Sequence, residues 1–402
     1  MRIGFFTDEF LPRTDGVVTS MINLKKGLEA RGHEVFIIAP EYPGYHDEPN
    51  GIVRLRSMSG LVYDNIRFPF FGRKTVDQLA ELKLDVIHAQ TNFWASALAY
   101  RVAQKTKAPL VASVHVIAPE LYRDYRLQTW LTHLFMPPIM WHFFGRFDAS
   151  HYHVPEHAQH TSFFEKRGWK MLGLYIDLFD HCVVPSQHFA EDLKEVGVET
   201  PLTVLPNSID TAAYAVKRSS AKKKVFNIVA VGRLSGEKRQ DALIRAAAIL
   251  KEKELPFHLT LVGTGPKQRE YRHLVDRLVL NKHVSFTGLL EPHDVKQFLA
   301  QADVSALVSE NFDNQPMVVL EYAASGLPIL YCDPRLREGL NTDNAYLSKP
   351  DPESLAEALI HLAHHPEERV DMSEASVATA QEFDVTVKSK EFEKLYQSLL
   401  KR

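Results

Sequence analysis

The chain has 402 residues and a mass of 45.7 kDa, more than one ordinary hydrophobic core holds, so two domains are expected. Lys and Arg number 47 and Asp and Glu number 50, which gives a net charge of −3. This balance argues against a general nucleic-acid binder, which carries an excess of basic residues. Apolar residues make up 45% and charged residues 24%, as in globular proteins.

The cysteine content and the hydropathy pattern bear on the compartment. Two cysteines, Cys182 and Cys332, cannot build a disulfide framework, and such a low number fits a reducing environment. The N-terminal sequence is acidic by position 8 and is interpreted as a strand, not as a signal peptide. No run of 18 apolar residues occurs, so no membrane-spanning helix is expected. We therefore expect a cytoplasmic protein.

The first half of the chain alternates short apolar runs with amphipathic helical stretches. Residues 1–7 and 33–39 are continuous apolar runs, typical of strands buried on both faces. The helical periodicity of 18–31, between them, ends at Gly32. Further elements are expected as strands at 84–88, 109–114 and 181–184 and as helices around 75–82 and 93–106. This alternation predicts a doubly wound parallel sheet.

A polar, basic stretch at 217–224 interrupts the pattern and is interpreted as a linker. The same alternation then restarts. Strands are expected at 225–231, 258–262, 283–286, 304–308 and 327–331, and helices at 239–253, 267–280, 292–301 and 316–325, followed by a mostly helical tail over 351–402. The chain is therefore assigned to the α/β class, with two Rossmann-like doubly wound domains facing a cleft.

In open α/β sheets ligands bind beyond the carboxyl ends of the strands, so the residues there are the first candidates. Gly16 lies between the first strand and a helix, where it lets the backbone approach a phosphate, although a plain tight turn explains it equally well. His115 follows the strand at 109–114 and is expected to point into the cleft. A histidine held only by structural hydrogen bonds is the alternative.

Two cations mark the corresponding position in the second half. Arg233 and Lys238 follow the strand at 225–231, where an Arg fork and a Lys point charge suit a pyrophosphate. Two solvated surface charges are the alternative interpretation.

The stretch 309–326 carries the strongest single pattern. Asp313 and Asn314 are helix-capping residue types, and Gly326 is expected to end the helix. Glu321 is the charged residue in an otherwise apolar or aromatic segment, 317–324. Because an unpaired buried charge is costly, Glu321 needs strong partners, either ligand hydroxyls or a basic side chain.

Together these segments resemble the retaining glycosyltransferases of family 4, which have the GT-B fold. The resemblance extends over nearly the whole chain and rests on Gly16-Val-Val-Thr-Ser20, Arg31-Gly-His-Glu-Val35, Leu205-Pro-Asn-Ser-Ile-Asp210, Val231-Gly-Arg-Leu-Ser-Gly-Glu-Lys238 and the spacing from Asp313 to Glu321, which is that of the family's E-x(7)-E signature. Two positions depart from the pattern: Asp313 stands where the family has Glu, and Ser208 where it has Gly. Asp313 keeps the carboxylate, so similar chemistry is implied; Glu310 competes for this role, but its spacing to Glu321 differs.

The resemblance implies roles for individual residues. Arg233 and Lys238 would bind the donor diphosphate, Asp313 the hydroxyls of the donor sugar, and Glu321 the ribose. His115 would face the donor sugar and the acceptor, and with Arg233, Lys238 and Asp313 it makes up the expected catalytic set. The remaining expected donor contacts are Gly16, Leu289, Gln315, Pro316, Met317 and Val318.

The same resemblance implies a retaining, metal-independent hexosyltransferase of the EC 2.4 class, without a cofactor and without a covalent protein nucleophile. Glucose carried by UDP is the expected donor. Residues 1–206 would form the acceptor-binding domain, with a C-terminal helix at 385–402 packed on it, and residues 207–384 the nucleotide-sugar domain.

An aromatic segment in the N-terminal half is expected to bear on the acceptor. Its aromatic residues include Trp130, Phe135, Trp141, Phe143 and Phe144, with Arg and His residues between them, and Pro137-Pro138 divides it. Such a segment suits the membrane interface, as in the diacylglycerol glucosyltransferases of the family. We therefore expect a lipid or lipid-linked acceptor and peripheral contact with the inner face of the membrane; a buried aromatic cluster is the alternative.

Other interpretations remain at this stage. The histidines of 151–160 have spacing that could suit a metal, but lining of the acceptor cleft or a polar surface is expected instead. The alternative functions are a GT-B-type nucleotide-sugar epimerase, a family 4 transferase acting on a soluble acceptor, and a non-catalytic binding protein. The presence of Arg233, Lys238 and Glu321 argues against the first and the last of these.

Overall fold

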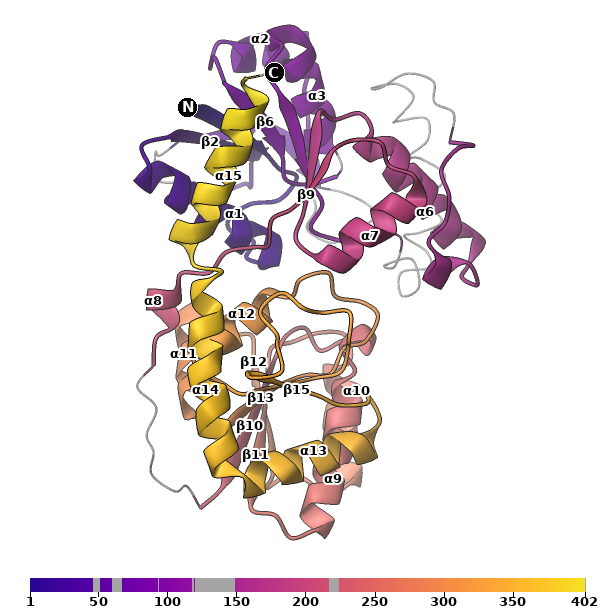
Figure 1. The fold of residues 1–402 in the computed structure, drawn as a ribbon, viewed down its shortest axis with the longest axis vertical. Helices are drawn as coiled ribbons and strands as arrows, with labels where there is room; N and C mark the ends of the chain where they lie inside the picture. The colour runs from indigo at the N-terminus through magenta and orange to yellow at the C-terminus, as the bar shows by residue number, and fades with distance from the viewer. Residues whose placement is uncertain are drawn as a thin grey trace. The chain divides into compact units, whose positions relative to one another are not determined.

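The computed structural model describes residues 1–45, 51–59, 67–92, 94–117, 119, 149–216 and 224–401. The chain divides into two compact units (Figure 1). The first unit consists of Met1–Asn207 and Val385–Arg402, and the second of Ser208–Asp384. The predicted linker, 217–224, lies outside the described residues except for Lys224.

A seven-stranded parallel sheet forms the centre of the first unit. Its strand order is β3-β2-β1-β6-β7-β8-β9. The strands are β1 (Arg2–Phe6), β2 (Glu34–Pro40), β3 (Ile52–Leu55), β6 (Val86–Ala89), β7 (Leu110–Ser113), β8 (His181–Val184) and β9 (Leu202–Val204), with a separate antiparallel pair, β4 (Ser57–Ser59) and β5 (Arg67–Pro69). The helices are α1 (Gly16–Ala30), α2 (Arg73–Ala80), α3 (Trp94–Thr106), α6 (Phe163–Ile176), α7 (Gln187–Val196) and α15 (Val385–Leu399), with a 3₁₀ turn at Glu156–Ala158.

Helices cover both faces of this sheet, because consecutive strand residues point to opposite sides. Phe5 of β1 belongs to a buried cluster that includes Met21 of α1 and Tyr396 of α15. Its neighbour Phe6 belongs to a second buried cluster, which includes Leu98 of α3. The apolar runs recognised in the sequence are thus strands with a core on each side.

The C-terminal helix α15 belongs to the first unit, although the second unit precedes it in the chain. It packs on α1, where a Cβ atom at Gly27 would lie 2.7 Å from the Cβ of Ser389. Glycine is therefore required at this helix crossing. At the end of α1, the Arg31 Nε donates a hydrogen bond of 2.7 Å to Glu393 of α15.

The second unit contains a six-stranded parallel sheet with the order β12-β11-β10-β13-β14-β15. Its strands are β10 (Phe226–Val231), β11 (Phe257–Val262), β12 (Val284–Gly288), β13 (Val304–Leu307), β14 (Ile329–Tyr331) and β15 (Ala345–Leu347). Its helices are α8 (Thr211–Tyr214), α9 (Gln240–Glu252), α10 (Gln268–Arg277), α11 (Pro292–Gln301), α12 (Met317–Ala324), α13 (Pro352–His364) and α14 (Pro366–Gln381), with a 3₁₀ turn at Gly236–Lys238. Figure 1 shows α11, α12 and α14 on one side of this sheet and α9, α10 and α13 on the other.

Both sheets follow the doubly wound pattern in which the strand order reverses beside the first strand of the unit. In the first unit the reversal lies between β1 and β6, and in the second between β10 and β13. The predicted fold class, two doubly wound parallel-sheet domains, is confirmed. The carboxyl ends of these four strands are the places where such sheets bind ligands.

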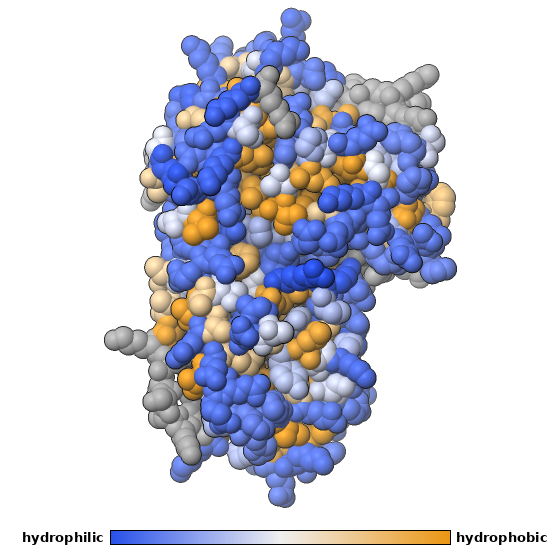
Figure 2. All heavy atoms as spheres, viewed as in Figure 1, coloured by the Kyte–Doolittle hydropathy of each residue, from blue (hydrophilic) through white to orange (hydrophobic). Residues whose placement is uncertain are grey.

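Hydrophilic residues dominate the face drawn in Figure 2, with hydrophobic patches between them in both units. Within the described ranges, every helix is too short or too polar to cross a bilayer.

Candidate active site

In the second unit, the loop after β10 is fixed by backbone contacts with the loop after β11. The N–H of Gly232 donates to the carbonyl of Val262 (2.9 Å), and the N–H of Leu234 donates to that of Thr264 (3.0 Å). Gly263 has a φ of +131°, and a Cβ atom there would lie 2.1 Å from the Gly232 carbonyl oxygen. This approach requires glycine, and it holds the following residues in place.

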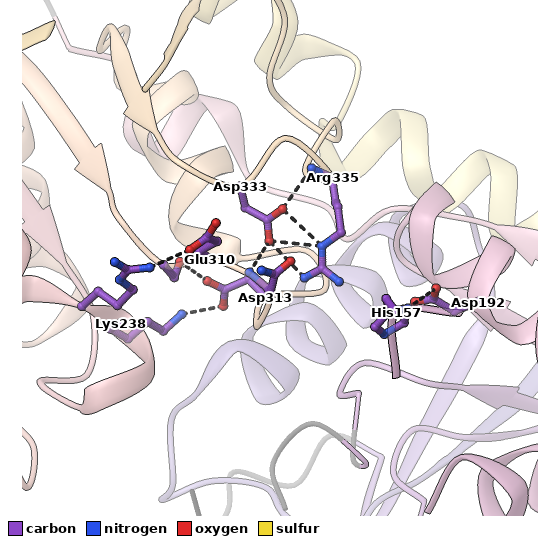
Figure 3. A network of polar contacts seen from close by, with 10 residues as sticks. His157, Asp192, Lys238, Glu310, Asp313, Asp333 and Arg335 are labelled. Carbon is purple, nitrogen blue, oxygen red and sulfur yellow. Dashed lines mark hydrogen bonds and ion pairs between the residues drawn. The ribbon is translucent and has the colours of Figure 1, made fainter. Parts of the chain in front are cut away.

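Lys238 and Asp313 form an ion pair at the end of this loop. Lys238 Nζ lies 2.5 Å from Asp313 Oδ1, and the Ser309 hydroxyl donates to Asp313 Oδ2, also at 2.5 Å (Figure 3). Lys238 follows β10 and Asp313 follows β13, the two strands at the reversal of strand order. The two residue types that the sequence assigned to the donor therefore meet at the expected edge of the sheet. Arg233, in the same loop as Lys238, is exposed.

The helix after Asp313 was predicted at 316–325 and lies at Met317–Ala324 in the structure. Helix α12 starts at Met317 with Pro316 as its N-cap, and no described side chain caps it. Asp313, although of a helix-capping residue type, does not cap α12: it lies three residues before Pro316, and its carboxylate accepts hydrogen bonds from Lys238 and Ser309. The helix ends as predicted, with Gly326 following it at a φ of +63°.

The uncapped N-terminus of α12 follows directly on buried polar residues. Asn314 and Gln315 are 6% and 7% exposed, and Pro316, Met317 and Val318 continue into the first turn. Backbone N–H groups at a helix N-terminus attract anions and hydroxyl oxygens. This segment can therefore bind an oxygen-rich ligand beside Asp313.

Glu321 lies in the second turn of α12, where burial raises the pKa of its carboxyl. The Tyr214 hydroxyl, from α8, donates a hydrogen bond to this carboxylate, and the Lys296 charge acts against the raised pKa. Lys296 Nζ also lies 4.7 Å from the centre of the Tyr214 ring. The sequence predicted that Glu321 needs a ligand hydroxyl or a basic side chain as its partner. The structure provides Lys296 as the nearby charge, while the hydroxyl of Tyr214 makes the hydrogen bond to Glu321.

Sequence reasoning missed a second set of charges around this site (Figure 3). Asp333, 1% exposed, accepts the N–H of Asn311 (2.8 Å) and pairs with Arg335 (3.0 Å). Arg239 Nη1 donates to Glu310 Oε2 at 2.6 Å. Asp333 follows β14, so the rule on carboxyl ends of strands would have identified it. Glu310, considered as a rival of Asp313, is paired with Arg239 instead of Lys238.

In the first unit, Gly16 opens α1, and the residue before it already caps the helix. Asp15 Oδ1 accepts the N–H groups of Val17 and Val18, both at 3.0 Å. A carboxylate therefore lies next to the backbone that the sequence assigned to phosphate. An Asp directly before a helix, as Asp15 is here, is a sequence signal for such an N-cap.

A second acidic residue of this loop has an unusual pKa. Burial raises the pKa of Glu9 to about 7, the Asp15 charge adds to this, and the Arg13 charge opposes it. Arg13 Nε lies 3.4 Å from Glu9 and 3.2 Å from Asp15, so the Arg13 side chain forms ion pairs with both carboxylates. Such perturbed groups are frequent at functional sites, and sequence reasoning missed this one.

His115 lies two residues beyond β7 and contacts the strand next to it. Its Nε2 lies 3.1 Å from Oε1 of Gln90, which directly follows β6. Burial lowers the pKa of His115 to about 4, although the Asp15 carboxylate acts in the opposite direction. Gln90 in turn contacts His88, a fully buried histidine. The imidazole of His115 is therefore neutral at pH 7. Its contact with Gln90 connects it to the end of β6.

Two other predictions concern exposed or undescribed residues. Leu289, expected near the donor base, follows β12 and is 82% exposed. The aromatic residues proposed for the acceptor, Trp130, Phe135, Trp141, Phe143 and Phe144, lie outside the described residues.

The histidine-rich stretch 151–160 makes individual contacts. His157 Nδ1 lies 3.4 Å from Asp192 Oδ1 (Figure 3), and its ring packs edge-on against Trp169. His153 contributes to the lining of an open surface hollow in the first unit. These contacts fit a polar surface role for this stretch.

A group with metal-ligand composition lies where α13 meets α14. One potential ligand atom from each of His361, His365 and Glu368 lies within 4.8 Å of the others, and His361 Nε2 is 2.7 Å from Glu368 Oε2. None of the residues that the sequence assigned to the donor belongs to this group.

Two doubly wound parallel-sheet domains in one chain are the arrangement of the GT-B fold. Residues 14–213 match the family model described as Glycosyltransferase Family 4, and residues 215–378 match that of glycosyl transferases group 1. The two matches together extend over most of the chain. The protein belongs to glycosyltransferase family 4 and is a glycosyltransferase.

Curated relatives agree with this assignment. The chain is 26% identical to the alpha-monoglucosyldiacylglycerol synthase of Acholeplasma laidlawii, over 100% of this chain and 98% of the relative. It is also 26% identical to the enzyme of the same name from Streptococcus pneumoniae, over 82% of this chain and 70% of the relative.

Solved structures share the fold at lower sequence identity. Anabaena HepE in complex with UDP and glucose superposes with a TM-score of 0.72, at 18% identity, over 99% of this chain and 100% of that chain. Sucrose-phosphate synthase from Thermosynechococcus elongatus has a TM-score of 0.71, at 16% identity, over 99% of this chain and 98% of that chain. These similarities establish the fold.

Proposed function

We propose that this protein transfers glucose from UDP-glucose to a hydroxyl of a diacylglycerol-type lipid at a membrane surface, with retention of anomeric configuration and without a metal. The names of the curated relatives support the sugar and the lipid. The observation that carries the proposal for the donor is the Lys238–Asp313 pair beside the open N-terminus of α12.

The donor is proposed to lie along the strand ends of the second unit. Arg233 and Lys238 bind the diphosphate, Asp313 and the backbone of 315–318 bind hydroxyls of the sugar, and Glu321 binds the ribose. The hydrogen bond from Tyr214 supports the last role, because it orients one oxygen of a carboxylate that burial makes costly to leave unpaired. Leu289 is proposed to pack near the base through its backbone.

In the proposed reaction the bond from the anomeric carbon to the diphosphate breaks while the acceptor hydroxyl attacks from the same face. The acceptor proton passes to an oxygen of the leaving diphosphate, so no protein nucleophile is required. Arg233 and Lys238 neutralise the charge that develops on the leaving group, which is the role a metal has in other enzymes. Retention and metal independence are parts of this proposal.

The acceptor is proposed to bind to the first unit, through His115 and the aromatic residues of the 125–147 segment, while Gly16 contributes backbone near the phosphates. A diacylglycerol stays in the bilayer, so its transferase must reach the membrane surface. A peripheral contact through interfacial aromatic side chains meets this requirement without a spanning helix.

The proposal is tested by offering UDP-glucose, other nucleotide sugars and both lipid and soluble acceptors, and by identifying the products by mass spectrometry. We expect glucosyl-diacylglycerol from UDP-glucose, an α-anomeric signal by NMR, and equal rates with and without EDTA. Conversion of the donor in the absence of any acceptor would instead indicate an epimerase. If products form only with soluble acceptors, the proposed lipid acceptor is wrong.

A further inference from the structure

The junction of α13 and α14, in the second unit, brings two histidines and a carboxylate together. His361 lies in the last turn of α13, His365 is the residue between the two helices, and Glu368 lies in the first turn of α14. One potential ligand atom from each residue lies within 4.8 Å of the other two. Imidazole nitrogen is a ligand that Zn²⁺ and Ni²⁺ favour, whereas Mg²⁺ and Ca²⁺ prefer oxygen. The composition of the group therefore points to a divalent transition metal.

Hydrogen bonds hold the backbone that carries these side chains. The carbonyl of His361 accepts the backbone N–H of His365 at 3.1 Å and also lies 2.7 Å from Nδ1 of the His365 ring. Arg369 Nη1, from α14, donates to the carbonyls of Leu362 and Ala363 in the last turn of α13. The side chains of the group thus project from a turn that is joined on both sides, which favours a preformed site.

The hydrogen bond of His365 gives its ring the arrangement of a metal ligand. A carbonyl oxygen only accepts, so Nδ1 carries a proton, and in the neutral ring the lone pair is on Nε2. Histidines that bind metals commonly donate their other ring N–H to a backbone carbonyl in this way, which sets the tautomer and the direction of the ring. His365 is exposed, so an ion from solution can reach it.

The other two residues of the group share a proton. His361 Nε2 lies 2.7 Å from Glu368 Oε2, and the carboxylate favours a positive charge on His361. The rings of His361 and His365 are stacked, with their centres 4.1 Å apart, so a second charge on His365 would be repelled. A divalent ion in place of the shared proton would attract the same carboxylate more strongly. The carboxyl end of α13, which lies here, also favours a cation.

The distances allow one ion to contact all three residues. Zn²⁺ lies about 2.0–2.2 Å from nitrogen and oxygen ligands, so the ligand atoms of a tetrahedral site are about 3.3 Å apart. The contact between His361 and Glu368 would open slightly, and His365 would move closer. The side chains of His361 and Glu368 are 37% and 39% exposed, so their torsions can make this adjustment. Water can occupy the fourth position.

We propose that His361, His365 and Glu368 form a binding site for a divalent transition-metal ion, Zn²⁺ in the first place, which ties the end of α13 to the start of α14. The ion stabilises the folded state, because the three ligands come together only when both helices have formed. It takes no part in sugar transfer, so this inference is independent of the proposed function.

The proposal is tested on the full chain without an affinity tag, after removal of metals with a chelator. Isothermal titration with Zn²⁺ should show binding of a single ion at this site, and Zn²⁺ and Ni²⁺ should each raise Tm, whereas Mg²⁺ should not. His365→Gln and Glu368→Gln should each weaken Zn²⁺ binding at least about tenfold, since even the loss of a residue that only supports a ligand costs about 10- to 100-fold. The rise in Tm should disappear in both variants.

The matched control is His364→Gln, because His364 is an exposed neighbour in the same turn that does not belong to the group. It should bind Zn²⁺ like the wild type. Wild-type binding by His365→Gln and Glu368→Gln, or an equal loss in the control, would show that Zn²⁺ binds elsewhere and would overturn the proposal. An equal rise of Tm with Mg²⁺ would exclude the imidazoles as ligands. Sugar transfer does not enter these measurements, so a failure of the proposed function would leave their result unchanged.

Discussion

Lys238 and Asp313 are 75 positions apart in the chain, yet their charged atoms lie 2.5 Å apart. They meet because β10 and β13 are neighbours at the reversal of the strand order, so the segments that follow the two strands lie side by side. The side chains are 19% and 10% exposed, which makes the pair more than a solvated surface contact. If Lys238 binds the diphosphate and Asp313 binds a sugar hydroxyl, these two groups of the donor lie next to each other at this pair.

Replacing Lys238 by alanine removes the cation that the proposed reaction needs at the leaving group. Loss of one such preorganised group typically costs about 10²- to 10³-fold in rate, and we expect a fall of this size in kcat/KM for the donor. Lys238→Arg keeps the charge and should retain part of the activity. Steady-state assays with varied donor measure both effects.

The exposed Lys253 of the same unit provides the control, since Lys253→Ala removes a charge outside the site. Because Lys238 and Asp313 contact each other, their effects should not add: the double alanine variant should be less impaired than the product of the single effects. Activity of Lys238→Ala within threefold of the wild type would contradict the assignment.

The position of this pair was predictable, whereas its partners were not. The apolar run of β10, followed by Arg233 and Lys238, marks a strand end in the sequence. The apolar run of β13, followed by Asp313, marks another. Periodicity does not tell which side chains pair, so the contacts of Lys238 and Ser309 with the two carboxylate oxygens of Asp313 could not be predicted. Asp333 escaped notice because the residues after β14 follow no family motif.

Edge strands limited the prediction of the fold. The strands predicted from continuous apolar runs are present within about two residues, since a run buried on both faces leaves a strong pattern. β3, β9 and β15 lie at the edges of their sheets and were not predicted; they have only three or four residues each, so the runs that mark them are short. Helices α6 and α7 were not predicted, although the buried residues of α7 follow helical spacing.

Glu321→Gln should weaken donor binding and at the same time stabilise the protein. A charged hydrogen bond to the ribose contributes about 1.5–3 kcal/mol, so we expect a rise of roughly 10- to 100-fold in the KM for the donor. Burial raises the pKa of Glu321, so stability is lost as the pH rises from the ordinary value of 4.5 through the pKa of the folded state. Glutamine removes this loss, and thermal melts at pH 8 should show a higher Tm than the wild type.

At pH 4, below the ordinary pKa of 4.5, the carboxyl group is largely protonated in both states, so the two melting temperatures should approach each other. Glu357→Gln, on the exposed side of α13, serves as the control and should change neither Tm nor KM. If Glu321→Gln leaves the donor KM unchanged, Glu321 has a structural role with Tyr214 and does not bind the ribose.

The aromatic segment is tested by membrane binding. We expect the wild type to co-sediment with vesicles that contain diacylglycerol and anionic lipid, because interfacial tryptophan and phenylalanine side chains insert at the headgroup level. The triple variant Trp130→Ser, Trp141→Ser, Phe143→Ser should bind at least tenfold less. Val279→Ser, which changes a 68% exposed apolar residue of the second unit, should bind like the wild type. Equal and negligible binding of all three proteins would remove the membrane contact from the proposal.

Glu9 gives the protein a pH-dependent stability near neutrality. Its pKa is raised from 4.5 to about 7, chiefly by burial and next by the Asp15 charge. For an acid with a raised pKa the folded state holds the proton more tightly. The contribution of Glu9 to the free energy of unfolding is therefore fully present below pH 4.5 and declines between pH 4.5 and 7. Above pH 7 it stays at the lower level. Glu9→Gln should remove this decline.

We expect Glu9→Gln to exceed the wild type in stability at pH 8 by roughly 1–3 kcal/mol, since each unit of pKa shift corresponds to about 1.4 kcal/mol. Urea unfolding at pH 5, 6, 7 and 8 measures the difference, which should grow with pH and level off above 7. The exposed Glu81, changed to Gln, should give a pH-independent difference near zero. A constant offset for Glu9→Gln across this range would show that the carboxyl of Glu9 does not titrate there.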